Sequence, residues 1–231
     1  MTITEPTTML TDYLLGGLAV WFAMKLAQHF RATKQRPILL WAATFAGLAL
    51  ASFSGGAYHG FSGYLSASAL AILWKITLYS IGVVSLALFS AATTAAFEGS
   101  TRKVLLAAGV FKFAVYAIWI ANHNDFLYAI ADYTPAMLYV LLLQARAWLR
   151  REASGPWIVT GVLVSFAAAG VQQIGFAPHR HFNHNDLYHV IQMLGVYLLY
   201  RGGRLLTDRG SPIPLRTAAD RATPRHVHSE P

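Results

Sequence analysis

The sequence predicts an all-α protein, an integral membrane bundle of seven transmembrane helices. Of its 231 residues 55% are hydrophobic and only 12% are charged, whereas ordinary soluble domains carry about a quarter charged residues. The apolar residues also occur in runs too long for amphipathic packing against a core. These observations exclude a soluble enzyme, a disordered chain and a disulfide scaffold. The lack of cysteine also excludes thiol catalysis, thiolate metal sites and iron–sulfur clusters.

Seven stretches meet the requirement of about 20 mostly apolar residues for a membrane span. In order, they cover residues 13–30, 37–58, 66–97, 104–121, 126–149, 157–176 and 187–205. The first follows a segment without Lys or Arg and has no small-residue cleavage pattern, so we interpret it as a retained span and not as a signal peptide. The third is longer than a span requires and is expected to tilt or to emerge from the bilayer. All seven are expected to be helices, because an open strand would leave backbone groups unpaired in lipid.

Basic residues in the short connections set the predicted orientation. Those on one side are Arg31, Lys34, Arg36, Arg102, Lys103, Arg146, Arg150, Arg151, Arg201 and Arg204. The connections on the other side hold Arg180 alone. Basic connections stay in the cytoplasm, so the N-terminus is predicted outside and the C-terminus in the cytoplasm.

The chain is expected to have one transmembrane domain, residues 1–206, and a flexible cytoplasmic tail, residues 207–231. The tail is rich in Pro, Arg and small polar residues, as flexible segments are. The formal charge of +8 does not indicate nucleic acid, because the basic residues follow the ends of the spans. The expected partners are therefore membrane lipids, one of which is a possible substrate, and the expected location is the cell inner (plasma) membrane, crossed several times.

Most of the histidines fall near the predicted outer ends of the spans. These are His59, His123, His179, His181, His184 and His189. His59 ends the second stretch and His189 lies one turn inside the seventh, so both are expected at a similar shallow depth. Imidazoles on different helices of a bundle can converge on a metal, and His184 at the start of the seventh stretch is placed to join them. The alternative is that the histidines are only hydrogen bonded at the headgroup level, and that Asp125 and Asp186 are only helix caps.

A short motif, Asn-His-Asn-Asp, occurs at residues 122–125 and again at 183–186, before the fifth and seventh helices. Both copies are predicted to lie on the outer side. The motif is either a repeated way of capping a helix or the mark of a duplicated helix pair whose polar caps line one outer pocket.

Three charged residues lie within the predicted spans: Lys75, Lys112 and Asp132. An unpaired charge inside a bilayer is costly, so such residues usually face one another or a wet cavity. We expect an ion pair from Asp132 to either Lys75 or Lys112. The functional alternative is a proton relay or a polar substrate cavity.

With seven spans, His59 after the second and His189 in the last, the chain resembles the CREST superfamily of membrane proteins, which includes alkaline ceramidases and adiponectin-receptor-like proteins. The resemblance implies a zinc ion held by one histidine at the end of helix two and two on helix seven, with a serine and an aspartate completing the pattern. Zinc-bound water would then attack a lipid amide.

The chain departs from that pattern at several positions. The serine expected four residues before His59 is Gly55, with Ser54 adjacent, and the first histidine of helix seven is replaced by Asn185, with His184 one residue away. Helix three contains no acid, so its aspartate would come from another part of the chain: Asp12, Asp132 or Asp186.

Two functions follow from these residues. The first is a zinc-dependent intramembrane hydrolase of a lipid amide or ester, with His59, His184 and His189 as zinc ligands and Asp186 or Ser54 acting on the bound water. The second is a non-enzymatic membrane sensor, transporter or haem-binding bundle that uses the same outer-side histidines.

Overall fold

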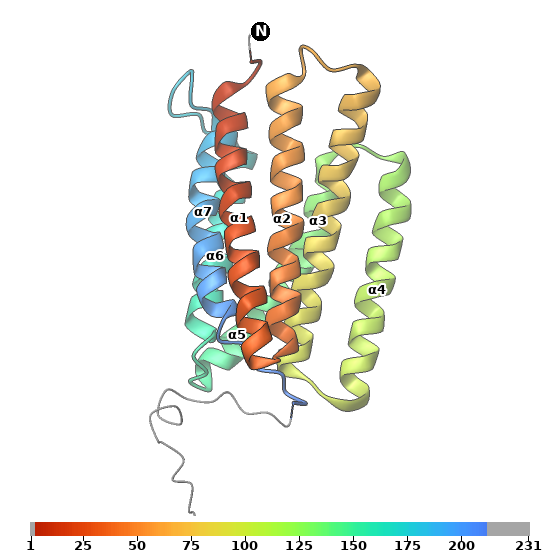
Figure 1. Cartoon of the computed structure of the whole chain (residues 1–231), viewed down its shortest axis with the longest axis vertical. Coiled ribbons are helices and arrows are strands. Elements are labelled where there is room, and N and C mark those ends of the chain that lie inside the picture. Colours follow the sequence, from red (N-terminus) through yellow and green to blue (C-terminus); the bar gives the residue numbers. More distant parts are fainter. Residues whose placement is uncertain (1–2, 212–231) are drawn as a thin grey trace, which may run out of the picture.

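Residues 3–211 are described by the computed structural model, and they fold into seven α-helices without a β-sheet (Figure 1). The helices are α1 (Pro6–Thr33), α2 (Arg36–Phe61), α3 (Ala67–Ala96), α4 (Gly99–Asn122), α5 (Phe126–Leu149), α6 (Gly155–Ile174) and α7 (His184–Gly203). The predicted helical bundle is confirmed, and each helix contains most of the stretch that predicted it. Residues 212–231, which make up most of the expected tail, lie outside the described residues.

Six of the helices form a closed ring. Neighbouring pairs are α1 with α2, α2 with α3, α3 with α5, α5 with α6, α6 with α7, and α7 with α1. Helix α4 is not part of this ring and packs chiefly on α3, at the edge of the bundle (Figure 1). Every ring helix therefore has one face toward the interior of the ring, where polar side chains can be shielded from lipid.

Within residues 3–211, six helices, α1 to α6, are long and apolar enough to cross a membrane. Helix α7 falls short because its first half carries polar side chains. These are His184, Asn185, Asp186, His189 and Gln192. Asp186 and His189 are buried against the other helices, so the polarity of α7 does not reflect contact with water.

The two ends of the bundle differ in charge. We call the end where α1 begins the N-terminal end, and the opposite end, which holds the ten basic residues of the connections named above, the basic end. The chain passes between α1 and α2, α3 and α4, and α5 and α6 at the basic end, as the predicted topology requires (Figure 1). Asp208 lies at this end, where Arg102 Nη2 approaches its carboxylate at 2.6 Å and its backbone N–H donates to Gln35 Oε1 at 2.6 Å. The part of the expected tail nearest the bundle is thus packed against it.

Of the two lysines predicted to pair with Asp132, Lys112 forms the ion pair. Lys112 Nζ of α4 lies 2.6 Å from Asp132 Oδ1 of α5 and donates to Ser85 Oγ of α3 at 3.0 Å. Lys75 instead donates to the backbone carbonyls of Ile120 and His123, the latter at 2.9 Å, at the C-terminal end of α4. A lysine at this position also interacts favourably with the negative end of the helix dipole.

Candidate functional site

A pocket of about 260 Å³ lies inside the ring near the N-terminal end. All six ring helices contribute to its wall, which includes Leu15, Leu48, Trp74 and Tyr188. The polar residues of the wall are Asp12, Ser52, His59, Thr77, Gln172, Asn185 and His189. So many polar side chains in one cavity are unusual inside an apolar bundle, where each is costly unless it is hydrogen bonded or meets a ligand.

Asp12 of α1 and His189 of α7 form the most buried polar pair of the pocket. Asp12 Oδ1 lies 3.2 Å from His189 Nε2, and the two residues are only 6% and 7% exposed. The other ring nitrogen of His189, Nδ1, lies 2.9 Å from Thr11 Oγ1. Both ring nitrogens are therefore engaged, and a proton lies between Nε2 and Oδ1 whichever of the two atoms carries it.

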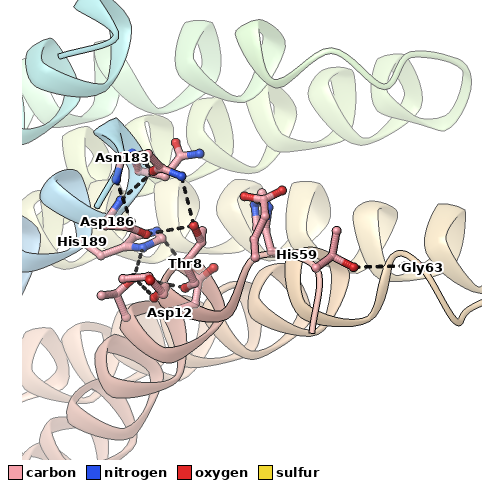
Figure 2. A network of polar contacts seen from close by, with 12 residues as sticks. Thr8, Asp12, His59, Gly63, Asn183, Asp186 and His189 are labelled. Carbon is pink, nitrogen blue, oxygen red and sulfur yellow. Dashed lines mark hydrogen bonds and ion pairs between the residues drawn. The ribbon is translucent and has the colours of Figure 1, made fainter. Parts of the chain in front are cut away.

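The start of α7 holds this pair in place. The Asn183 side chain accepts from the backbone N–H groups of Asn185 and Asp186, and Asp186 Oδ2 accepts from the backbone N–H of Asn183 at 2.7 Å. Asp186 Oδ1 also accepts from Thr8 Oγ1 of α1 at 2.8 Å. This capping box fixes the first turn of α7 and ties it to α1, so that His189 meets Asp12 (Figure 2).

His59 lies to one side of this cluster, at the end of α2 (Figure 2). Its Nδ1 atom is 3.4 Å from Glu5 Oε2, a separation at which only a weak electrostatic attraction acts. That nitrogen is buried and has no hydrogen-bond partner among the described residues. His59 thus supplies the pocket with an imidazole whose Nδ1 makes no hydrogen bond within residues 3–211 and lies near the Glu5 carboxylate.

The structure brings together some of the predicted site residues and separates others. His59 and His189 line the same pocket, whereas His184 is a half-buried residue at the start of α7 and is not part of the pocket wall. Asp186 uses one carboxylate oxygen in the cap of α7 and the other in the hydrogen bond with Thr8 of α1. Ser54 faces α3: its hydroxyl lies 2.7 Å from the Leu50 carbonyl and 2.9 Å from Thr77 Oγ1.

No group of three or more histidine, aspartate or glutamate residues that could hold a metal occurs within residues 3–211. The predicted ligands His59, His184 and His189 therefore do not form a zinc site as they stand. The donors that share the pocket are two imidazoles and the Asp12 carboxylate, and Asp12 already engages His189.

Asp12 is the functional residue that the sequence indicated least clearly. It was one of three acids that could replace the missing aspartate of helix three. It faces Gly55, where a Cβ atom would lie 3.7 Å from Asp12 Oδ2. The sequence feature that points to Asp12 is its place directly before the first apolar stretch. Hydropathy does not show that its side chain faces α7.

The two Asn-His-Asn-Asp motifs are not structurally equivalent. In the first, Asp125 is the N-cap of α5 and accepts from Leu127 N at 2.8 Å. In the second, the N-cap is Asn183, three residues earlier in the motif. Only the second copy contributes to the pocket, through Asn185, which accepts from Gln172 Nε2 of α6 at 3.1 Å. The motif is a repeated way of capping a helix.

A second cavity, of about 120 Å³, lies deeper inside the ring and is lined mainly by apolar side chains. The two cavities share part of their walls: Leu48, Ile81, Phe126 and Tyr188. A polar chamber near one end of the bundle thus adjoins an apolar chamber closer to its middle.

Residues 7–208, which contain every residue of the pocket and all of the helices except the first residue of α1, match the model of DUF6962, a family of unknown function. The chain belongs to this family. No curated protein and no solved structure matches the chain. The DUF6962 match ends at Asp208, the residue that pairs with Arg102 at the basic end.

Proposed function

We propose that this protein binds a small amphiphilic molecule of the membrane inside its helix ring. The polar group would lie against Asp12, His59 and His189, and the apolar part would enter the deeper cavity. The observation that carries this proposal is the shared wall between the polar pocket and the apolar cavity. The function belongs to the non-enzymatic class predicted above, a sensor or transporter that uses the outer-side histidines.

The side chains of the pocket favour a ligand that both donates and accepts hydrogen bonds. Asp12 is an acceptor, Gln172 and Asn185 each carry a donor and an acceptor, and an imidazole can act as either. A primary amide or a hydroxyl group satisfies such a set. The cavities are small compared with the roughly 300–1,000 Å³ of most ligand sites, which favours a short acyl chain.

Zinc-dependent hydrolysis of a lipid amide or ester is a second proposal. The buried, unpartnered Nδ1 of His59 favours it, because an imidazole nitrogen is a good zinc ligand. The donors of the described chain do not gather three ligands, so we derive no catalytic step through the metal. Haem binding, which would use His59 and His189, is a further alternative proposal.

Ligand binding can be measured through Trp74, which lines the pocket. We expect octanamide, added to the purified protein in mild detergent, to change the tryptophan fluorescence, and the change to be lost in Trp74→Phe. His189→Ala and Asp12→Asn should each weaken binding about tenfold, since each changes a buried polar group of the pocket wall. His184→Ala is the matched control and should bind as the parent protein does. Equal affinity in the parent protein, His189→Ala, Asp12→Asn and His184→Ala would refute the proposed site.

The purified protein in mild detergent also allows zinc-dependent hydrolysis and haem binding to be tested. About one zinc per chain by elemental analysis, lost in His59→Ala, together with hydrolysis of the amide, would support the hydrolase. A strong visible absorption band with bound iron would support haem.

We also propose that α7 crosses the membrane as a seventh span, with the N-terminus outside and the basic end in the cytoplasm, at the plasma membrane. The chain has no cysteine, so single cysteines can report the side of the membrane. A membrane-impermeant maleimide should label Arg180→Cys, before α7, in intact cells and label Arg204→Cys, after α7, only once the cells are opened. The opposite labelling pattern would reverse the orientation, and labelling of both in intact cells would refute the seventh span.

A further inference from the structure

A separate pocket of about 550 Å³ lies at the basic end, far along the bundle from Asp12 and His189. Its wall is formed by the ends of α3 and α5, the connection from α5 to α6, and the segment that follows α7. One part of the wall is apolar and includes Phe97, Leu143, Leu205 and Leu206. The other part is polar and basic.

Three arginines line the basic part: Arg146, Arg150 and Arg209. Within residues 3–211 their side chains make no hydrogen bond and no ion pair. Arg102, at the same end, shows the contrast, because it is paired with Asp208. The only acid in the pocket wall is Glu152, so the pocket carries more positive than negative charge.

The side-chain amide of Gln144 also lines this space. Gln144 lines the pocket although it is only 4% exposed, and its Oε1 accepts from Ser154 Oγ at 3.1 Å. Its amide nitrogen has no partner among the described residues. Because this nitrogen is not one of the buried unpartnered atoms, it is accessible from the pocket and can donate to an acceptor placed there.

From this arrangement we infer that the pocket binds a phosphate group through Arg146, Arg150, Arg209 and the Gln144 amide. The guanidinium group presents several N–H donors in a planar fork that matches phosphate oxygens. The apolar part of the wall is suited to the first carbons of an acyl chain, as in an anionic phospholipid. Basic pockets between transmembrane helices are typical sites for such headgroups. A free phosphate would offer the same oxygens without using the apolar wall.

The test uses the full chain in neutral detergent and three probes: dioctanoyl phosphatidic acid, inorganic phosphate and dioctanoylglycerol, which lacks the phosphate. We expect calorimetry to detect binding of the phosphatidic acid and not of dioctanoylglycerol. Arg146→Gln and Arg150→Gln should each weaken binding about tenfold, because each removes a charged donor. Arg151→Gln is the matched control: it makes the same charge change next to Arg150, but Arg151 is not part of the wall.

Glu152→Gln should bind more tightly than the parent protein, because it removes the carboxylate that repels the anion. Binding of phosphatidic acid alone would identify a lipid headgroup as the ligand, and equal binding of inorganic phosphate would identify a free anion. No binding of either probe would overturn the inference. A loss in Arg151→Gln as large as in Arg150→Gln would overturn it as well, because charge alone would then explain the affinity.

Discussion

The pair between Lys112 and Asp132 allows a sharp test of how this bundle accommodates charge. Replacing Lys112 by Met keeps an unbranched chain and removes the ammonium group. Asp132 then stays inside the bundle with its side chain only 5% exposed. Its Oδ2 atom already has no hydrogen-bond partner among the described residues, and Lys112→Met would leave Oδ1 without one too.

The size of the effect follows from that loss. Removing one partner of a buried pair costs about 3–5 kcal/mol, because the other charge stays desolvated. Lys112 itself is 35% exposed, so we take the lower limit, about 3 kcal/mol. For a domain of this length, 1 kcal/mol shifts the melting temperature by about 2–4 °C, which gives a decrease on the order of 10 °C.

Thermal unfolding in mild detergent, followed by circular dichroism, measures this change. Asp132→Asn should cost less than Lys112→Met, because it leaves the more exposed lysine. The double variant Lys112→Met/Asp132→Leu removes both charges, and we expect it to be more stable than Lys112→Met alone. A melting temperature of Lys112→Met equal to that of the parent protein would refute the reasoning. A double variant that lost the sum of the two single effects would refute it equally.

Two further changes test packing at other places in the bundle. Gly56→Ala would place a Cβ atom 2.7 Å from the Tyr13 ring, so we expect a loss of about 1–3 kcal/mol in thermal unfolding, whereas Gly17→Ala, with no atom within 4 Å, should be neutral. Asp208→Asn weakens the contact with Arg102 and should lower the melting temperature and speed proteolysis at the basic end; unchanged cleavage would show that this segment is not held by the pair.

Six of the helices were predictable because helix formation in a membrane depends on local properties. A stretch of about 20 apolar residues must form a helix in lipid wherever it packs, so the positions of α1 to α6 followed from hydropathy, whereas α7 is less apolar. The ends were shifted by a few residues. Polar first turns extend α1 and α4 beyond their apolar stretches, to Pro6 and to Gly99, although neither N-cap residue makes a side-chain hydrogen bond to its helix.

The polar contacts were predictable only in part. Lys112 and Asp132 had to find partners, since an unpaired charge is costly in a bilayer. Which lysine would pair depended on α4 lying outside the ring, where Lys112 reaches α5 while Lys75 reaches the end of α4. The sequence does not predict that α4 lies outside the ring, because α4 is apolar like the helices of the ring.

The sequence by itself determined an all-helical chain, the approximate positions of its helices, and the concentration of basic residues at one end. Only the tertiary structure decided which polar side chains meet. Periodicity shows which face of a helix is apolar, but it does not name the neighbour on that face. Thus His59 and His189 share a pocket with Asp12. His184 lies five residues before His189, on another face of α7, and does not line the pocket. The closed ring brings α1 beside α7, and this contact between the two ends of the fold creates the site.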